Sequence, residues 1–286
     1  MTAATRKKIS VIVFIAVAAI VVLSCIFPLF WLYTSGFKIP SDFLSYDFRL
    51  FPSQWTADNY SGLITDNLSG AYLPKYSSVV QSVYATLTVA SVALVLSLFT
   101  NSAAAYVFAR LNFKGKKIVW LYYAVTMFVP NMAVMIPCYQ IVSSLGMLNT
   151  FWGLTLPGVP YVWSIFFYRQ FYLSVPRSLE DAARVDGCGR IRIYFRIFLP
   201  LSGTPFVIMG ISVFQGFWNS YIWPIMTVDN PMLMQLNQLI SYFKSSQGTQ
   251  WHYLIAGSAL ASVPLIVLLV VFQKFIIQGV KISGIK

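Results

Sequence analysis

The sequence is poor in charge and in the residues that usually build metal or catalytic sites. Only 10% of its 286 residues are charged, it contains a single histidine, and its three cysteines, Cys25, Cys138 and Cys188, lie far apart. These cysteines have no metal-binding or redox spacing, and no Gly-x-x-x-x-Gly-Lys-Ser/Thr phosphate loop is present. We therefore expect unpaired structural thiols and no metal, nucleotide or other cofactor bound by this chain.

So little charge excludes a soluble globular protein. Charged residues make up about 25% of an ordinary soluble domain, whereas 58% of this chain is hydrophobic. The net charge of +12 does not indicate a nucleic-acid partner, because such binding needs basic residues on a wet face. Disorder is excluded as well, since it requires low hydrophobicity. We expect an all-α, polytopic membrane protein surrounded by lipid.

Six apolar stretches have a length near the roughly 20 residues that a membrane-spanning helix needs. They are Ile9–Tyr33, Val79–Phe108, Ile118–Val142, Leu154–Phe171, Pro205–Val228 and Leu254–Phe275. The first is too long for the apolar region of a signal peptide, so it is interpreted as an uncleaved span. Pro157 and Pro160 lie near the start of the fourth. The expectation is one transmembrane domain of six helices over residues 1–286.

The lysines and arginines orient these helices. If the N-terminus is inside, inner segments hold sixteen basic residues and outer loops hold four, namely Lys38, Arg49, Lys75 and Lys244. Cytoplasmic loops carry such an excess, so both termini are expected in the cytoplasm. No charged residue lies deep within an apolar stretch, which argues against a proton-coupled carrier working alone.

The inner loop over residues 175–203 has the most informative pattern. Ser178 and Asp181 have the spacing of a capping box. This spacing predicts a short helix over Leu179–Asp186, ended by Gly187 in a left-handed conformation.

Two further features of this loop indicate contact with another protein. Ala182 and Ala183 give the predicted helix a bare side that permits close approach. An amphipathic stretch follows, with apolar residues at i, i+3, i+4 and i+7 on one face: Ile191, Tyr194, Phe195 and Phe198. An ordinary re-entry into the membrane is the alternative, but it does not explain a capped, small-faced helix. We therefore expect a docking element for a soluble partner.

The loop resembles the EAA signature of bacterial ABC importer permeases, Glu-Ala-Ala-x3-Gly-x9-Ile-x-Leu-Pro. Asp181-Ala182-Ala183, Gly187, Ile197 and Leu199-Pro200 stand at the matching positions, with Asp181 for Glu as the single departure and Glu180 just before it to compensate. Shorter similarities cover nearly the whole chain: Phe51-Pro52, Asn59-Tyr60, Tyr106–Arg110, Gly115-Lys116-Lys117, Pro130, Pro137, Leu145-Gly146, Asn149-Thr150, Trp218-Asn219 and Gln278–Lys281. The closest likeness is to the second permease subunit of maltose-type, carbohydrate transporters.

The resemblance implies the type I ABC importer permease fold in the inner membrane of a bacterium. A solute-binding protein would deliver a sugar to this chain and a second, non-identical permease. Two copies of a cytoplasmic ATPase would hold ATP and Mg, so the chain itself would not be an enzyme. Coupling to the ATPase would rest on Glu180, Asp181, Ala182, Ala183, Arg184, Gly187, Ile197, Leu199 and Pro200. The tail Lys281–Lys286 would either touch the ATPases or be a simple solvated tail.

A sugar path needs amide or hydroxyl groups and flat aromatic faces. The fifth stretch offers Gln215, Trp218, Asn219 and Tyr221, and the third offers Asn131 and Tyr139. Packing between helices is the alternative role for these side chains. An ABC permease for a polyamine or an amino acid also fits the loop signature, and a secondary carrier or channel without an ATPase is the alternative from another class.

Overall fold

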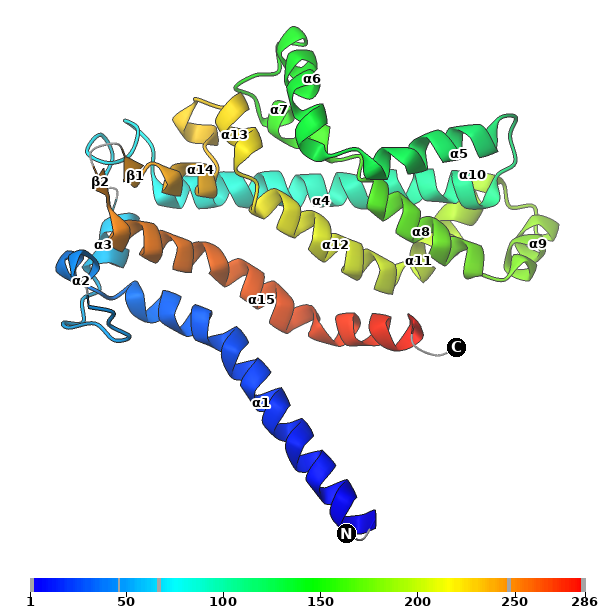
Figure 1. The fold of residues 1–286 in the computed structure, drawn as a ribbon. Helices are drawn as coiled ribbons and strands as arrows, with labels where there is room; N and C mark the ends of the chain where they lie inside the picture. The colour runs from blue at the N-terminus through cyan, green and yellow to red at the C-terminus, as the bar shows by residue number, and fades with distance from the viewer. Residues whose placement is uncertain (1–2, 46, 66–67, 246–247, 284–286) are drawn as a thin grey trace. The chain divides into compact units, whose positions relative to one another are not determined.

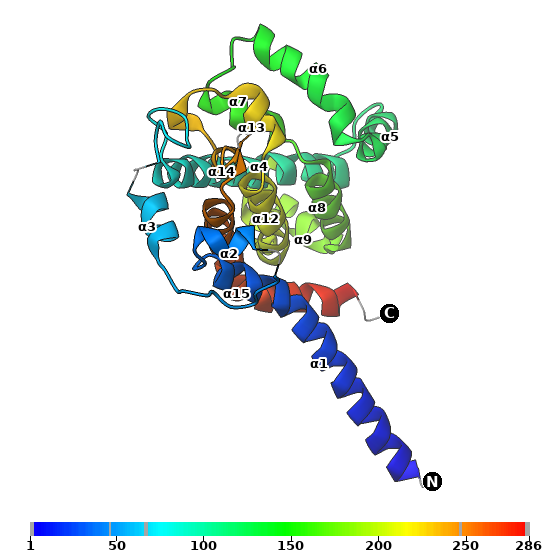
Figure 2. The same cartoon turned by 60° about the vertical axis from the view of Figure 1, so that its left-hand side comes forward.

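The computed structural model describes residues 3–45, 47–65, 68–245 and 248–283. These residues are mostly helical (Figures 1 and 2), and the two strands among them form one short hairpin. They divide into two compact units, one of residues 1–79 and 240–263 and the other of residues 80–239 and 264–286. The expected all-α class is confirmed.

The first unit is built around one long helix and the loop that follows it. Its elements are α1 (Ala3–Ser35), α2 (Pro40–Leu44), α3 (Asp58–Ile64), β1 (Lys244–Ser245), β2 (Gly248–Thr249) and the first half of α15 (Trp251–Ser283). The Phe51 ring meets Phe30 of α1 edge to face, with ring centroids 5.9 Å apart. Buried Asn59 donates hydrogen bonds to the carbonyl oxygens of Gly36 and Lys38. The loop after α1 is therefore an ordered structure folded onto the end of that helix.

The second unit contains α4 and most of the shorter helices. In chain order they are α4 (Val79–Arg110), α5 (Lys116–Val125), η1 (Thr126–Phe128), α6 (Asn131–Ser144), α7 (Phe151–Thr155), η2 (Leu156–Gly158), α8 (Val162–Ser174), α9 (Arg177–Val185), α10 (Arg190–Ile193), η3 (Tyr194–Phe198), α11 (Leu199–Leu201), α12 (Gly203–Trp218), α13 (Ile222–Thr227), η4 (Pro231–Leu233) and α14 (Leu236–Ser241). A Cβ atom on Gly210 of α12 would meet the Leu94 side chain of α4 at 3.4 Å, so these two helices pack closely.

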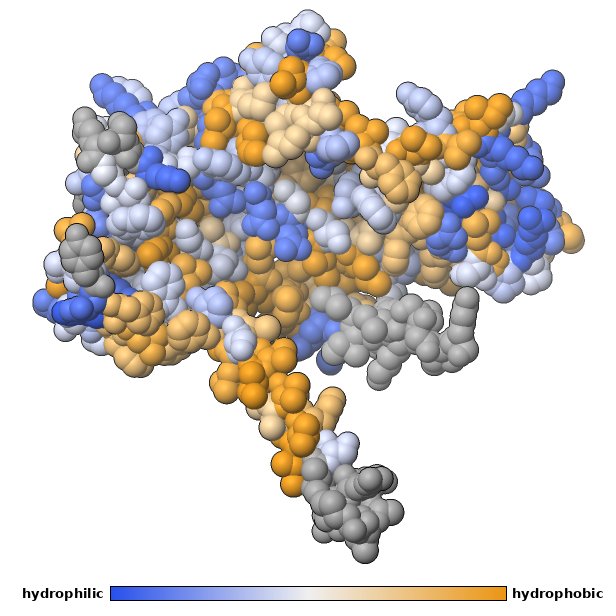
Figure 3. Space-filling model, in the orientation of Figure 1, coloured by the Kyte–Doolittle hydropathy of each residue, from blue (hydrophilic) through white to orange (hydrophobic). Residues whose placement is uncertain are grey.

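Three helical segments of the described chain are long and apolar enough to cross a membrane. They are Ser10–Ser35, Val79–Arg110 and Trp251–Phe275. Two more qualify only as bent pairs: Lys116–Phe128 with Asn131–Ser144 at 109°, and Arg190–Leu201 with Gly203–Trp218 at 78°. From Val11 to Phe30 the large apolar side chains of α1 are exposed (Figure 3). A polytopic membrane protein is the class that fits these helices.

The fourth expected span, Leu154–Phe171, is not one helix. α7 ends at Thr155, and α8 begins only at Val162. Pro157 and Pro160 lie between them and lack the backbone N–H that a continuous helix needs. The 13 residues of α8 extend about 20 Å, less than the roughly 30 Å hydrocarbon core. By length and composition the described chain has three to five spans, and the count of six is not confirmed.

A hydrophobic core in the second unit joins the end of α4 to α8, α10 and η3. Tyr172 and Phe198 are fully buried there, with ring centroids 5.1 Å apart. The Tyr172 hydroxyl pairs with the Ser202 hydroxyl at 2.9 Å, and the Tyr194 hydroxyl pairs with that of Ser102 at 2.7 Å. Buried hydroxyls require such partners, so these pairs determine how the aromatic side chains of the core are placed.

Asn101 of α4 hydrogen-bonds the backbone at the break between α7 and α8. Its amide nitrogen donates to the Val159 carbonyl at 3.1 Å, and its amide oxygen accepts from the Tyr161 N–H at 3.3 Å. Where water is scarce, backbone groups freed by a break must find partners in the protein. Asn101 supplies both a donor and an acceptor.

We expect Asn101→Leu to lower the free energy of unfolding by about 1–3 kcal/mol, because it leaves the Tyr161 N–H unpaired and removes one of two donors to the Val159 carbonyl, which keeps the Ser97 hydroxyl. Denaturation of the purified protein in detergent micelles measures this change. Thr100→Val is the matched control, since the exposed Thr100 hydroxyl bonds only the Leu96 carbonyl of its own helix. Equal losses in the two variants would contradict the role given to Asn101.

Candidate functional site

The helix α9 starts earlier than the sequence predicted. It spans Arg177–Val185, and the residue before it is Pro176, which has extended backbone angles. No side chain caps this end, so the predicted capping box of Ser178 and Asp181 is wrong. Pro176 sets the start instead, and this places Ser178 inside the first turn.

The end of α9 agrees with the prediction. Gly187 has a φ of +76°, in the left-handed region that favours glycine. Its N–H donates to the Arg184 carbonyl at 3.0 Å, and the Cys188 N–H donates to the Ala183 carbonyl at 2.9 Å. These two bonds form a Schellman motif, which stops the helix after Val185.

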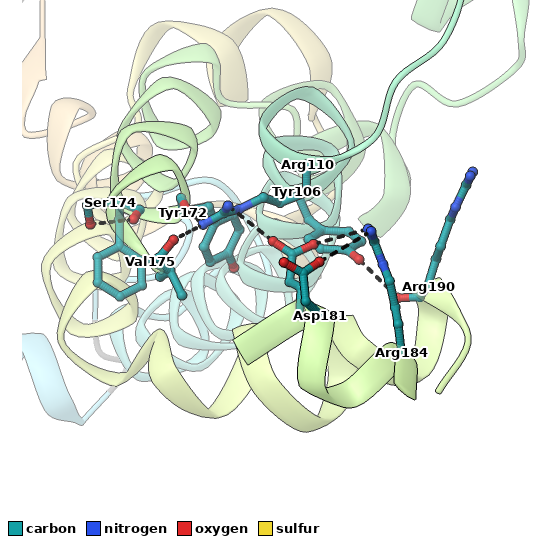
Figure 4. A network of polar contacts seen from close by, with 10 residues as sticks. Tyr106, Arg110, Tyr172, Ser174, Val175, Asp181, Arg184 and Arg190 are labelled. Atoms are coloured by element: carbon teal, nitrogen blue, oxygen red, sulfur yellow. Dashed lines mark hydrogen bonds and ion pairs between the residues drawn. The ribbon is translucent and has the colours of Figure 1, made fainter. Parts of the chain in front are cut away.

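The inner face of α9 is held by a buried ion pair. Glu180 lies 3.1 Å from the Arg110 guanidinium at the end of α4, and each side chain is 5% exposed. Arg110 also donates to the carbonyl oxygens of Tyr172 and Val175 where α8 ends (Figure 4). Its guanidinium carbon lies 5.1 Å from the centre of the Phe198 ring. One arginine therefore contacts α8, α9 and η3.

The outer face of α9 combines charge with small and apolar side chains. The Asp181 side chain is 67% exposed and lies 3.7 Å from Arg184. Leu179, Ala182 and Val185 are also exposed, Val185 to 88%. We call the exposed set Leu179, Asp181, Ala182 and Val185 the outer face of α9. Leu179 and Val185 are the large apolar side chains of this face.

The predicted bare side of two alanines is wrong. Ala182 is exposed on the outer face, whereas Ala183 is partly buried against the core of the second unit. Successive residues of an α-helix point about 100° apart, so neighbouring alanines do not share one side. Only Ala182 is open to a partner.

The predicted amphipathic face of the next stretch is also wrong. Tyr194 and Phe198 are buried as expected, but Ile191 and Phe195 are exposed, and Ile193 is buried instead. Residues Tyr194–Phe198 form a π-helical turn. Its i→i+5 bonds are wider than those of an α-helix, so the side chains leave the 3.6-residue period.

The remaining signature residues turn the chain toward α12. Ile197 and Leu199 pack against the core, while Pro200 is exposed within α11. The 78° bend before α12 follows. Ser202 lies at this bend, and its hydroxyl donates to the Phe198 carbonyl at 2.6 Å. Ile197 and Leu199 therefore lie inside the loop, whereas Pro200 lies on its exposed surface.

Basic residues are numerous in the α4–α5 turn and in the loop that contains α9, and Figure 3 shows hydrophilic side chains over this end of the second unit. They come from the α4–α5 turn (Lys114, Lys116 and Lys117) and from the loop itself (Arg177, Arg184, Arg190, Arg192 and Arg196). The tail Lys281–Lys286, expected to be near an ATPase, lies outside the described side chains.

The expected substrate-path residues lie in different environments. Trp218 is 1% exposed, and its ring stacks on Phe214. Gln215, Asn219 and Tyr221 are exposed, as is Asn131, and Tyr139 is half-buried. Trp218 therefore belongs to the packed interior.

A cavity of about 650 Å³ lies within the second unit, between the α5–α6 bend, the start of α8 and the α12–α13 region. Asn131 is the only expected path residue that lines it. Sequence reasoning missed the lining residues Trp163, Ser212, Ser220 and Trp223. The prolines that break the third and fourth stretches were the available signal for these residues, because the breaks shape the cavity.

These observations define a multi-pass membrane protein that presents an anchored helix on a basic surface. Residues 101–282 match the family described as "Binding-protein-dependent transport system inner membrane component", and the chain belongs to this family. The resemblance to ABC importer permeases is confirmed.

Two relatives and one solved structure match over almost the whole chain. The arabinooligosaccharides transport system permease protein AraQ of Bacillus subtilis (strain 168) is 31% identical over 264 residues, 91% of this chain and 90% of AraQ. The probable ABC transporter permease protein YurM of the same organism is 30% identical over 262 residues, 91% of this chain and 83% of YurM. A chain of a bacterial ABC transporter involved in the import of the acidic polysaccharide alginate has a TM-score of 0.79 at 19% identity, covering 96% of this chain and 98% of that one. The ABC importer permease fold is confirmed.

We expect Gly187→Pro to unwind the end of α9. Proline removes the N–H that bonds the Arg184 carbonyl, and its ring excludes a φ of +76°. Hydrogen exchange of α9 amides in the purified protein measures the loss as faster exchange. Gly187→Asn is the control, because asparagine tolerates the left-handed region. Unchanged protection in the proline variant would contradict the importance of this cap.

Proposed function

We propose that this chain is a permease subunit of an ATP-driven importer for a sugar or oligosaccharide. The observation that carries the substrate class is the similarity to AraQ, which belongs to an arabinooligosaccharide transport system and aligns with 91% of this chain. The chain would form the path with a second permease and receive solute from an extracytoplasmic binding protein. It supplies no ATP chemistry, which belongs to two copies of a cytoplasmic ATPase that hold ATP and Mg.

We propose that α9 and both termini lie in the cytoplasm. The basic residues around α9 support this orientation, because segments rich in Lys and Arg stay on the cytoplasmic side. The outer loops hold only four basic residues. The ATPase would then meet α9 directly.

The outer face of α9 is the proposed contact with the ATPase. Asp181 offers a carboxylate to basic groups on the partner, and Ala182 permits close approach. Val185 is 88% exposed and becomes buried only in a complex. Arg184 pairs with Glu180 at 3.6 Å and with Asp181 at 3.7 Å, and the Asp181 side chain stays 67% exposed. Gly187, Ile197, Leu199 and Pro200 support this surface by fixing the loop around it.

The cavity at the α5–α6 bend is the proposed part of the solute path on this chain. Its lining joins the hydroxyl and amide groups of Ser212, Ser220 and Asn131 with the aromatic rings of Trp163 and Trp223. Sugars bind to such mixtures of polar groups and flat faces. Gln215, Asn219, Tyr221 and Tyr139 remain path candidates outside this cavity. The burial of Trp218 favours packing for that residue.

We expect Ala182→Trp to lower ATP-dependent uptake about tenfold or more, which corresponds to about 1.4 kcal/mol of lost contact. The indole would hold the ATPase away from the outer face of α9. Uptake of a labelled arabinooligosaccharide into cells expressing the chain with its partner subunits measures the effect. The amount of ATPase that co-purifies with each variant is measured in parallel. Ala182→Ser is the control and should retain uptake.

Three results would count against this function. Wild-type uptake and ATPase binding in Ala182→Trp would overturn the docking surface. Uptake that continues after ATP depletion would favour a carrier or channel, and uptake of a polyamine or amino acid in place of the oligosaccharide would change the substrate class.

We expect Asn131→Leu to raise the apparent KM for the same oligosaccharide about fivefold, since one hydrogen bond contributes about 1 kcal/mol. Gln140→Leu on the same helix serves as the control and should keep its KM, because Gln140 is exposed but does not line the cavity. Initial rates of uptake over a range of concentrations measure both. An unchanged KM in Asn131→Leu would contradict the proposed path.

A further inference from the structure

We infer that the buried pair of Arg110 and Glu180 is the joint that transmits movement of α9 to the membrane helix α4, with Arg110 as a positioning residue. The inference rests on the proposed function, because it names how the docked helix would drive the permease. Both residues belong to the second unit, and neither is part of the outer face of α9.

The two neighbouring acids of the loop have different positions and therefore different roles. The Glu180 side chain is 5% exposed and faces Arg110, whereas the Asp181 side chain is 67% exposed. A partner protein can reach Asp181 and cannot reach Glu180. Glu180 therefore does not compensate for aspartate at position 181 in docking, as the sequence suggested, but attaches α9 to the rest of the unit.

The attachment of α9 depends on this carboxylate to an unusual degree. Of the nine residues of α9, all of them described, Glu180 alone is buried. Ala183 adds a small, partly buried contact. A helix with one buried residue has little apolar packing to hold it, so the ion pair determines its position.

Arg110 is suited to act as a joint because its guanidinium has several donors in a fixed plane. One amino group forms the ion pair with Glu180 at 3.1 Å, and the other donates to the carbonyl oxygens of Tyr172 and Val175. The guanidinium carbon lies 5.1 Å from the centre of the Phe198 ring. Arg110 is also the last residue of α4. A displacement of α9 would therefore reach α4 and the end of α8 through one side chain.

The buried location makes this link stiff. Separating the two groups would leave the buried Arg110 without its carboxylate and Glu180 with only the half-exposed Arg184 at 3.6 Å, which is strongly unfavourable. The two helices thus move together or the pair breaks at high cost. Apolar residues in place of both partners often keep a protein as stable, so stability and transmission can be separated by experiment.

The test compares Arg110→Met, Glu180→Met and the double variant Arg110→Met/Glu180→Met, each purified as the complete complex in proteoliposomes. The readout is labelled arabinooligosaccharide transported per ATP hydrolysed. We expect the double variant to be more stable than either single variant, although the Tyr172 and Val175 carbonyls lose the Arg110 donor. It should keep its bound ATPase but transport at least fivefold less solute per ATP. The single variants should lose both stability and transport. Arg192→Met, on an exposed arginine of the same loop, is the matched control and should match the wild type.

Two other results would overturn the inference, and a third would refute the proposed function. A wild-type ratio of solute to ATP in the double variant would overturn the inference and leave the pair as packing only. Loss of the bound ATPase would show that Glu180 belongs to the docking surface, which also overturns it. A wild-type complex without ATP-dependent uptake would instead refute the proposed function.

Arg110→Lys extends the test to a variant that keeps the charge. A lysine ammonium is a compact point charge and cannot hold Glu180, Tyr172 and Val175 in one plane. We expect Arg110→Lys to transport at least twofold less solute per ATP hydrolysed. This variant tests the role of Arg110 even if the double variant does not insert into the membrane. An unchanged ratio would overturn the role of Arg110 as a joint.

Discussion

The contact between the Arg110 guanidinium and the Glu180 carboxylate determines the geometry of the whole loop. It places α9 against the ends of α4 and α8, directs Ala183 inward, and so presents Asp181 and Ala182 outward. An ion pair that is buried needs further hydrogen bonds to offset the loss of water. The carbonyl oxygens at the end of α8 supply them, which explains why three elements converge on one arginine.

The scarcity of water within a membrane explains many of the other hydrogen bonds in the second unit. Breaks in helices free backbone groups, and within a membrane only the protein can satisfy them. Asn101 does so before α8, and the hydroxyl pairs of Tyr172 with Ser202 and of Tyr194 with Ser102 follow the same rule in the core. Breaks stabilised in this way allow short helices to enclose a cavity, where unbroken helices would pack along their whole length.

The features that were predicted correctly depend on local properties of the chain. Long apolar runs identified α1, α4 and α15, and the left-handed Gly187 ended α9 as expected. The errors arose at local breaks and where a residue's direction depended on a distant group. Pro176 moved the start of α9, the π-helical turn of Tyr194–Phe198 left Phe195 exposed, and the bend after Phe128 decided which polar residues line the cavity.

The amino-acid sequence alone determined the membrane class, the long helices and the loop signature, because these follow from composition, run length and residue spacing. The tertiary structure decided which of two adjacent acids faces the core, which alanine is open to a partner and which polar side chains line the cavity. The pattern Glu180-Asp181-Ala182-Ala183 is compatible with several rotations of the helix about its axis. Only the position of Arg110, brought close by folding, selects the rotation in which Glu180 is buried, because a charge in that place needs its partner.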